Sequence, residues 1–173
     1  MEKTLQMKLA ALILIILTYG CFQNNEISSI NPENWSKRAV DISKNDSLEY
    51  GKSYLSVYSQ IYSFSQSQKY NLTGMISLRN TSDADTIYLL KAAYFDTHGS
   101  LIRAYFDYPI FLSPLETIEI IIDHKDEEGG TGGNFIFEWK TPGGCPEPLF
   151  EGVMSSMQGS LGISFTTQAR RIE

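Results

Sequence analysis

The sequence predicts an all-β protein, folded as an antiparallel β-sandwich of seven to eight strands that is immunoglobulin-like in the broad sense. Two observations carry this prediction. Short segments alternate apolar and polar residues, which is the pattern of strands with one buried face. Clusters of Gly, Pro, Asn and Asp separate these segments at intervals of roughly 10–15 residues, as in other all-β domains. A small closed barrel is the alternative architecture.

The clearest strands lie in the middle of the chain, where we expect Asn71–Asn80, Thr86–Phe95 and Leu101–Phe106. The second of these is apolar on both faces except at Lys91, so it is expected near the centre of a sheet. The sequence Asp96-Thr97-His98-Gly99 predicts the hairpin turn into the third strand, because Gly readily takes the positive φ that such turns need.

Further strands are expected on both sides of this region. Glu49–Tyr62 is expected to form the first strand, with Leu55, Val57 and Ile61 in the core, and Ser63–Lys69 a polar loop. The later strands are expected at Glu116–Asp123, Phe135–Lys140, Phe150–Met154 and Leu161–Gln168.

The first 20 residues have the pattern of a signal peptide: Lys3 and Lys8 precede nine apolar residues, Leu9–Leu17. Nine residues are too few to span a bilayer, which needs about 20. The sequence Gly20-Cys21 that follows resembles the lipobox of bacterial lipoproteins, in which the Cys is lipidated, although Thr18 occupies a position where Leu is usual. The resemblance implies lipidation of Cys21 and, because Phe22 rather than Asp follows it, an outer-membrane location facing the periplasm.

Cleavage before Cys21 would leave 153 residues and change the net charge from −6 to −7. An acidic chain is a poor partner for nucleic acid and for anionic membrane surfaces, so membrane attachment is expected through the lipid anchor alone. Residues 21–48 are predicted to be the lipidated Cys and a flexible tether, in which Trp35 and Val40 are candidates for contact with the domain. Residues 49–173 are predicted to be one β-sandwich domain.

Four tyrosines recur at every fourth position of the expected first strand, which would place them on one face: Tyr50, Tyr54, Tyr58 and Tyr62. Exposed aromatic rings in a row can stack on sugars or anchor a protein, so this face is the candidate binding surface. The alternative is that the rings simply cover the outer face of the sheet.

No catalytic motif stands out, so we expect no enzyme, no cofactor and no metal site. The acidic stretch Asp123–Glu128 beside a Gly-rich loop offers oxygen ligands to calcium, but its spacing is not that of an EF-hand, and a solvated, mobile loop is the simpler interpretation. Cys145 lies among Gly and Pro with no basic neighbour in sequence to lower its pKa.

Several segments, in the same order, resemble an uncharacterised bacterial lipoprotein family, domain of unknown function 3124. They include Ser77-Leu78-Arg79-Asn80-Thr81, Tyr94-Phe95-Asp96-Thr97-His98-Gly99 and Gly162-Ile163-Ser164-Phe165-Thr166. The resemblance covers about residues 49–171 and implies secretion, a lipid anchor and a sandwich-like domain, but no activity. The sequence therefore predicts a binding or structural module of the cell envelope that recognises a protein or glycan. The alternative is an enzyme or calcium-dependent protein that uses loop 123–133 or Cys145.

Overall fold

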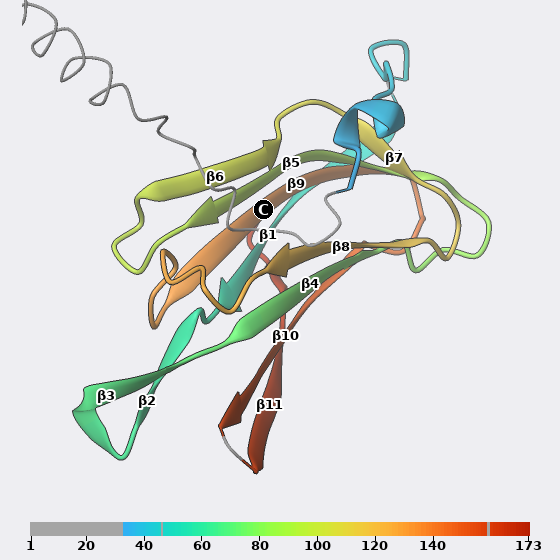
Figure 1. Ribbon diagram of the computed structural model, residues 1–173. Helices are drawn as coiled ribbons and strands as arrows, with labels where there is room; N and C mark the ends of the chain where they lie inside the picture. Colours follow the sequence, from blue (N-terminus) through green and yellow to red (C-terminus); the bar gives the residue numbers. More distant parts are fainter. Residues whose placement is uncertain (1–32, 46, 159) are drawn as a thin grey trace, which may run out of the picture.

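The computed structural model describes residues 33–45, 47–158 and 160–173. Within these residues two antiparallel sheets pack face to face and do not close into a barrel (Figure 1), which confirms the predicted all-β sandwich. The predicted signal peptide, Cys21 and the first part of the tether lie outside the described residues.

The larger sheet has the strand order β12-β1-β9-β5-β6, and β7 also pairs with β5. The bounds are β1 Leu48–Val57, β5 Ile87–Phe95, β6 Leu101–Phe106, β7 Ile110–Leu112, β9 Gly133–Pro142 and β12 Arg170–Arg171. Strand β5 lies between β9 and β6, at the interior position that its apolar character predicted.

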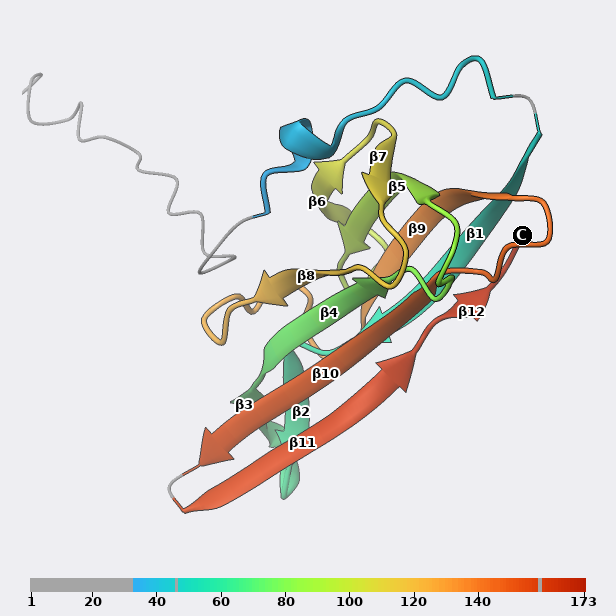
Figure 2. The ribbon, with the colours of Figure 1, turned by 90° about the vertical axis from the view of Figure 1, so that its right-hand side faces the viewer.

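The smaller sheet has the order β11-β10-β4-β8, and a separate hairpin pairs β2 with β3. The bounds are β2 Gln60–Ser63, β3 Ser65–Asn71, β4 Thr73–Arg79, β8 Thr117–Ile122, β10 Leu149–Gln158 and β11 Leu161–Gln168. Figures 1 and 2 show the β2–β3 hairpin and the end of the β10–β11 hairpin extending from the same end of the sandwich.

Aromatic side chains fill the space between the sheets. Every second residue of β9 is buried, and its rings form a stack in which Phe135 lies 5.4 Å from Phe137 and Phe137 lies 4.2 Å from Phe150 of β10, measured between ring centroids. The Phe137–Phe150 contact therefore joins the two sheets. Trp139 is also buried and lies so close to Gly51 that a Cβ there would fall 2.2 Å from the indole ring, so only Gly fits opposite it.

The segment before β1 lies against the sandwich. A short 3₁₀ helix, η1 (Trp35–Arg38), places Trp35 on Phe106 with 5.0 Å between ring centroids. Arg38 pairs with Glu33 at 2.9 Å and with Glu116 at 2.8 Å. The backbone N–H of Val40 donates to the carbonyl of Pro109. Both residues expected to contact the domain, Trp35 and Val40, thus do so.

Two expectations about the start of the domain are wrong. The strand expected over Glu49–Tyr62 ends at Val57, because the N–H groups of Ser59 and Gln60 turn away and donate to the carbonyl of Gly130. The polar loop expected at Ser63–Lys69 lies mostly within β3. These two differences, together with the short β7 and β12, raise the number of strands in the described residues to twelve.

Candidate functional site

The four tyrosines of the predicted binding surface do not form a row on one strand. Tyr50 and Tyr54 lie on β1, and Tyr54 donates to Oδ1 of Asn134 at 2.6 Å. Tyr58 follows the end of β1, is half-buried, and packs edge-on against Phe165 with 5.8 Å between ring centroids. Tyr62 lies in the β2–β3 hairpin and is exposed. The expected stripe is broken because the chain leaves the sheet after Val57.

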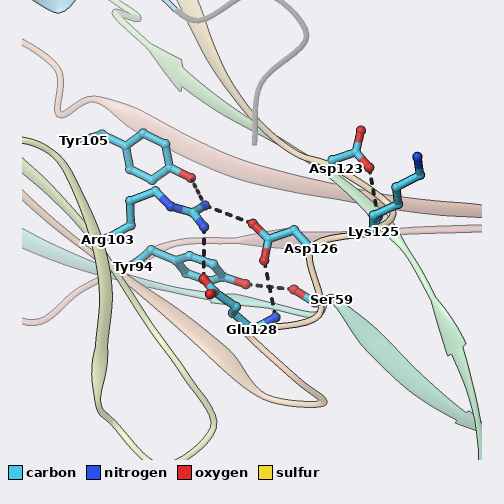
Figure 3. A network of polar contacts seen from close by, with 8 residues as sticks. All are labelled: Ser59, Tyr94, Arg103, Tyr105, Asp123, Lys125, Asp126 and Glu128. Carbon is cyan, nitrogen blue, oxygen red and sulfur yellow. Dashed lines mark hydrogen bonds and ion pairs between the residues drawn. The ribbon is translucent and has the colours of Figure 1, made fainter. Parts of the chain in front are cut away.

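Two residues of the acidic stretch, Asp126 and Glu128, belong to an ion-pair network (Figure 3), although most of the stretch is exposed to solvent. The carboxylate of Asp126 is only 1% exposed and accepts from Nη1 of Arg103 at 2.9 Å. Nη2 of the same guanidinium donates to Glu128 at 3.1 Å, and Tyr105 lies 3.3 Å from Nη1. The other oxygen of Asp126 accepts the N–H of Glu128. Residues from β6 and from the β8–β9 loop are thereby fixed together.

The glycines that follow are fitted closely to the sandwich. A Cβ at Gly129 would fall 1.7 Å from the hydroxyl of Tyr94, which itself lies 2.8 Å from Oγ of Ser59. The carbonyl of Gly129 accepts from Thr97 at 3.0 Å, and Gly130 has a φ of 63°. The Gly-rich sequence thus allows the loop backbone to contact the β1–β2 junction and the β5–β6 turn. Most side chains of Asp123–Glu128 are nevertheless exposed to solvent, as the sequence predicts. The backbone contacts lead us to expect a fixed rather than a mobile loop.

The pKa values of Tyr94 and Arg103 are both raised in this network. Burial raises the pKa of Tyr94 to about 12, so its phenol is neutral at physiological pH. Burial lowers the pKa of Arg103, but hydrogen bonds to Tyr105 and Asp126 more than reverse this and raise it overall. A permanently charged guanidinium against a buried carboxylate is suited to fixing a loop, and neither the phenol of Tyr94 nor the guanidinium of Arg103 is poised to transfer a proton near pH 7.

The other candidate residues of the sequence are separated from one another. Cys145 is a free thiol in the β9–β10 connection, and burial raises its pKa, which disfavours the reactive thiolate. His98 is exposed in the β5–β6 turn. In the part of the chain that the structure describes, no three His, Cys, Asp or Glu side chains gather as a set of metal ligands. No helix among the same residues is long and apolar enough to cross a membrane.

An open groove lies where β4 begins beside the β10–β11 hairpin and has a volume of about 570 Å³. Its lining contains no Asp, Glu, Lys or Arg and consists of the following residues: Thr73, His124, Ser155, Ser156, Met157, Gly162, Ile163 and Ser164. The groove exists because β4 ends its pairing with β10 at the Thr73–Ser155 pair, whereas β10 and β11 continue to the Gln158–Leu161 pair. Beyond Ser155 these two strands form a ribbon that pairs with no other strand of the described residues on either side.

The residues near the ends of the two hairpins expose large apolar side chains. Phe64, between β2 and β3, is 93% exposed and has a φ of 58°, a backbone conformation that is unfavourable for an aromatic residue. On the β10–β11 ribbon Leu161 is 76% and Met157 73% exposed. Figures 1 and 2 place both hairpins at the end of the molecule opposite η1.

Sequence reasoning missed the Arg103–Asp126 pair and the ribbon. Nothing local links Arg103 to Asp126, because they are 23 positions apart. For the ribbon one signal was present: the 18 residues from Gly152 to Ala169 contain no charged side chain, in a chain whose net charge is −6.

The fold and these features define a β-sandwich protein with one loop fixed by a buried ion pair and an open groove beside a hairpin ribbon. The chain belongs to the family described as protein of unknown function (DUF3124), whose model matches residues 50–172. No curated protein matches the chain. Among solved structures it is similar to the crystal structure of Thermotoga maritima 1070, with 10% identity, a TM-score of 0.44, and coverage of 69% of this chain and 92% of that chain.

Proposed function

We propose that this protein is a non-catalytic binding module of the bacterial cell envelope, anchored by a lipid on Cys21, that recognises a protein partner through its two projecting hairpins. The observation that carries the proposal is the exposure of Phe64, Met157 and Leu161 at the same end of the molecule. Exposed apolar side chains gathered in this way are typical of surfaces that bind other proteins.

The chemistry of the β10–β11 ribbon favours a protein over a glycan, whereas the exposed rings of Phe64 and Tyr62 on the β2–β3 hairpin suit either partner. The exposed side chains of the β10–β11 ribbon are aliphatic or sulfur-containing, and they offer no flat aromatic face on which a sugar ring stacks.

The proposed anchor and the hairpins lie at suitable places for this function. Cys21 precedes Glu33 by 12 positions, which span at most about 40 Å when fully extended. Because η1 follows directly and lies at the end opposite the hairpins, an anchored molecule would direct them away from its own membrane. The outer membrane, with the domain in the periplasm, is the location that the lipobox favours.

The anchor is tested by Cys21→Ser in the full chain. The substitution is expected to abolish fatty-acid labelling and to move the protein into the aqueous phase of a detergent partition. A variant that still partitions with the detergent would contradict the anchor without bearing on the hairpins.

Partner recognition is tested by placing a photo-crosslinking amino acid at single positions of the full chain in living cells. Phe64 and Met157 are the test positions, and Leu115 is the control because it is 66% exposed but precedes β8 at the end of the sheet far from Thr73. One protein captured from both test positions and not from Leu115 is the expected result. Equal capture from Leu115, or no capture from either hairpin, would refute recognition by this surface.

A further inference from the structure

The edges of the two sheets differ in how they are protected from pairing with another strand. Monomeric β proteins protect edge strands with charges, bulges or short length. Strand β6 has Arg103 and two irregularities in its pairing with β5, β8 carries Glu119, and β12 consists of two arginines. These edges are therefore poor templates for a further strand.

Strand β11 has none of these protections. It is eight residues long, contains no charge and no proline, and pairs with β10 over eight consecutive residue pairs without a bulge. Its other edge is free over the first part, where Leu161 to Ser164 are all exposed. The end of β11 lies against the larger sheet: the hydroxyl of Thr167 donates to the carbonyl of Ser56 on β1, and Arg170–Arg171 then pair with β1 as β12.

We propose that β11 pairs with β11 of a second copy of this chain, in an antiparallel, two-fold symmetric dimer that joins the two small sheets into one. The inference goes beyond the proposed function and does not depend on the partner that the hairpins bind. A homodimer of this kind repeats one patch on both subunits, so the patch must be complementary to itself.

Self-complementarity follows from the residues of the free segment. Leu161, Ile163 and Phe165 lie on one face of β11, and Gly162 and Ser164 on the other. The middle of the segment is Ile163. A two-fold axis there places Ile163 opposite its own copy and Leu161 opposite Phe165, while Gly162 meets Ser164 on the other face. Apolar pairs thus oppose each other on one face, as stable cross-strand pairing requires, and small residues do so on the other.

Charge also favours a second copy as the occupant. Two chains of net charge −6 repel over most of their surfaces, and the uncharged stretch from Gly152 to Ala169 is where they can approach without bringing like charges together. The edge has no charge that would select a particular foreign strand. A second copy of β11 necessarily has the same alternation of apolar and small residues, so the two strands match each other.

The dimer is tested on the full-length chain in detergent by analytical ultracentrifugation over a range of concentrations. The natural chain is expected to sediment as a concentration-dependent dimer. Ile163→Lys, which sets two like charges opposite each other, is expected to weaken dimerisation at least about tenfold. Leu115→Lys is the control and is expected to leave it unchanged.

A second variant covers the case in which Ile163→Lys disturbs the fold. Ile163→Cys in a Cys145→Ser background is expected to give a disulfide-linked dimer under mild oxidation, because residues directly opposite in antiparallel strands have Cβ atoms about 4.5–5.5 Å apart. The Cys145→Ser chain alone is the control. A monomer at every concentration, a dimer that Ile163→Lys leaves intact, or an edge that binds only foreign proteins would overturn the proposal.

Discussion

The β8–β9 loop and the β10–β11 ribbon both project beyond the paired part of their sheets, but they differ in how they contact the rest of the molecule. The loop is acidic, and Arg103 and Tyr94 fix it to the sandwich through a buried ion pair and a close backbone contact. The ribbon is uncharged, has two free edges and exposes its apolar side chains. The comparison teaches that local hydrophilicity is a poor guide to contact with the core, because the charged segment contains a buried carboxylate whereas the apolar segment exposes its large side chains.

The largest loss of folding stability is expected from removing Asp126, the buried carboxylate of the ion pair. Asp126→Ala leaves the guanidinium of Arg103 without its buried partner and is expected to lower the free energy of unfolding by about 3 kcal/mol, measured by urea denaturation. Glu128→Ala removes only the exposed partner of the same guanidinium and is expected to cost less than about 1 kcal/mol. Equal costs for the two variants would contradict the role of Asp126.

The contact between Tyr94 and the β8–β9 loop can be tested by measuring the free energy of unfolding at alkaline pH. Below pH 10 the phenol of Tyr94 is protonated in both the folded and the unfolded chain; as the pH rises toward 12 the unfolded chain loses the proton first, so folding stability falls. Two pKa units correspond to about 2–3 kcal/mol. The Tyr94→Phe chain has no phenol to ionise at this position, so its free energy of unfolding is expected to fall less between pH 10 and 12 than that of the natural chain. The difference in the free energy of unfolding between the two proteins therefore narrows over this range. Parallel stability curves for the two proteins would show that the phenol does not have the raised pKa.

The ribbon is expected to contribute little to folding. Met157→Ser combined with Leu161→Ser removes two exposed side chains and is expected to change the free energy of unfolding by less than about 0.5 kcal/mol, measured at a dilution where the chain is monomeric. Met154→Ser, on the same strand but fully buried, is the matched control and is expected to cost at least about 2 kcal/mol. A large loss in the double variant would mean that the ribbon belongs to the core.

The smallest change in stability is expected when calcium is added or removed. Because Arg103 occupies the carboxylates of Asp126 and Glu128, millimolar calcium or a chelator is expected to leave the melting temperature unchanged. A rise of several degrees with calcium would instead favour a metal site in the loop, since a ligand that binds only the folded chain stabilises it.

Local pattern was enough to predict the sandwich and several of its strands. Leu101–Phe106 and Leu161–Gln168 coincide with β6 and β11, because the alternation that identifies a strand depends only on the residues of that strand. The end of β1 was not predictable in this way. It depends on the carbonyl of Gly130, about 70 positions further along the chain, which takes the N–H groups of Ser59 and Gln60.

The candidate site could be predicted still less. The alternation of Leu161, Ile163 and Phe165 is the same whether or not another layer covers it, so the sequence does not show which of the three is buried. Only Phe165 is covered, by Tyr58, whereas Leu161 and Ile163 extend past the start of β4. Which part of a strand is covered depends on where its neighbours end, and that information lies elsewhere in the chain.

Hydrogen exchange of the full-length chain, followed by mass spectrometry at a low and a high protein concentration, tests the central contrast most directly. Amides of residues 126–133 are expected to be protected equally at both concentrations, because the ion pair and the close packing at Gly129 act within one molecule. Those amides of residues 161–165 that point away from β10 are expected to exchange rapidly in the dilute monomer and slowly in the concentrated dimer. Rapid exchange in the loop, or a ribbon whose exchange does not respond to concentration, would contradict the account.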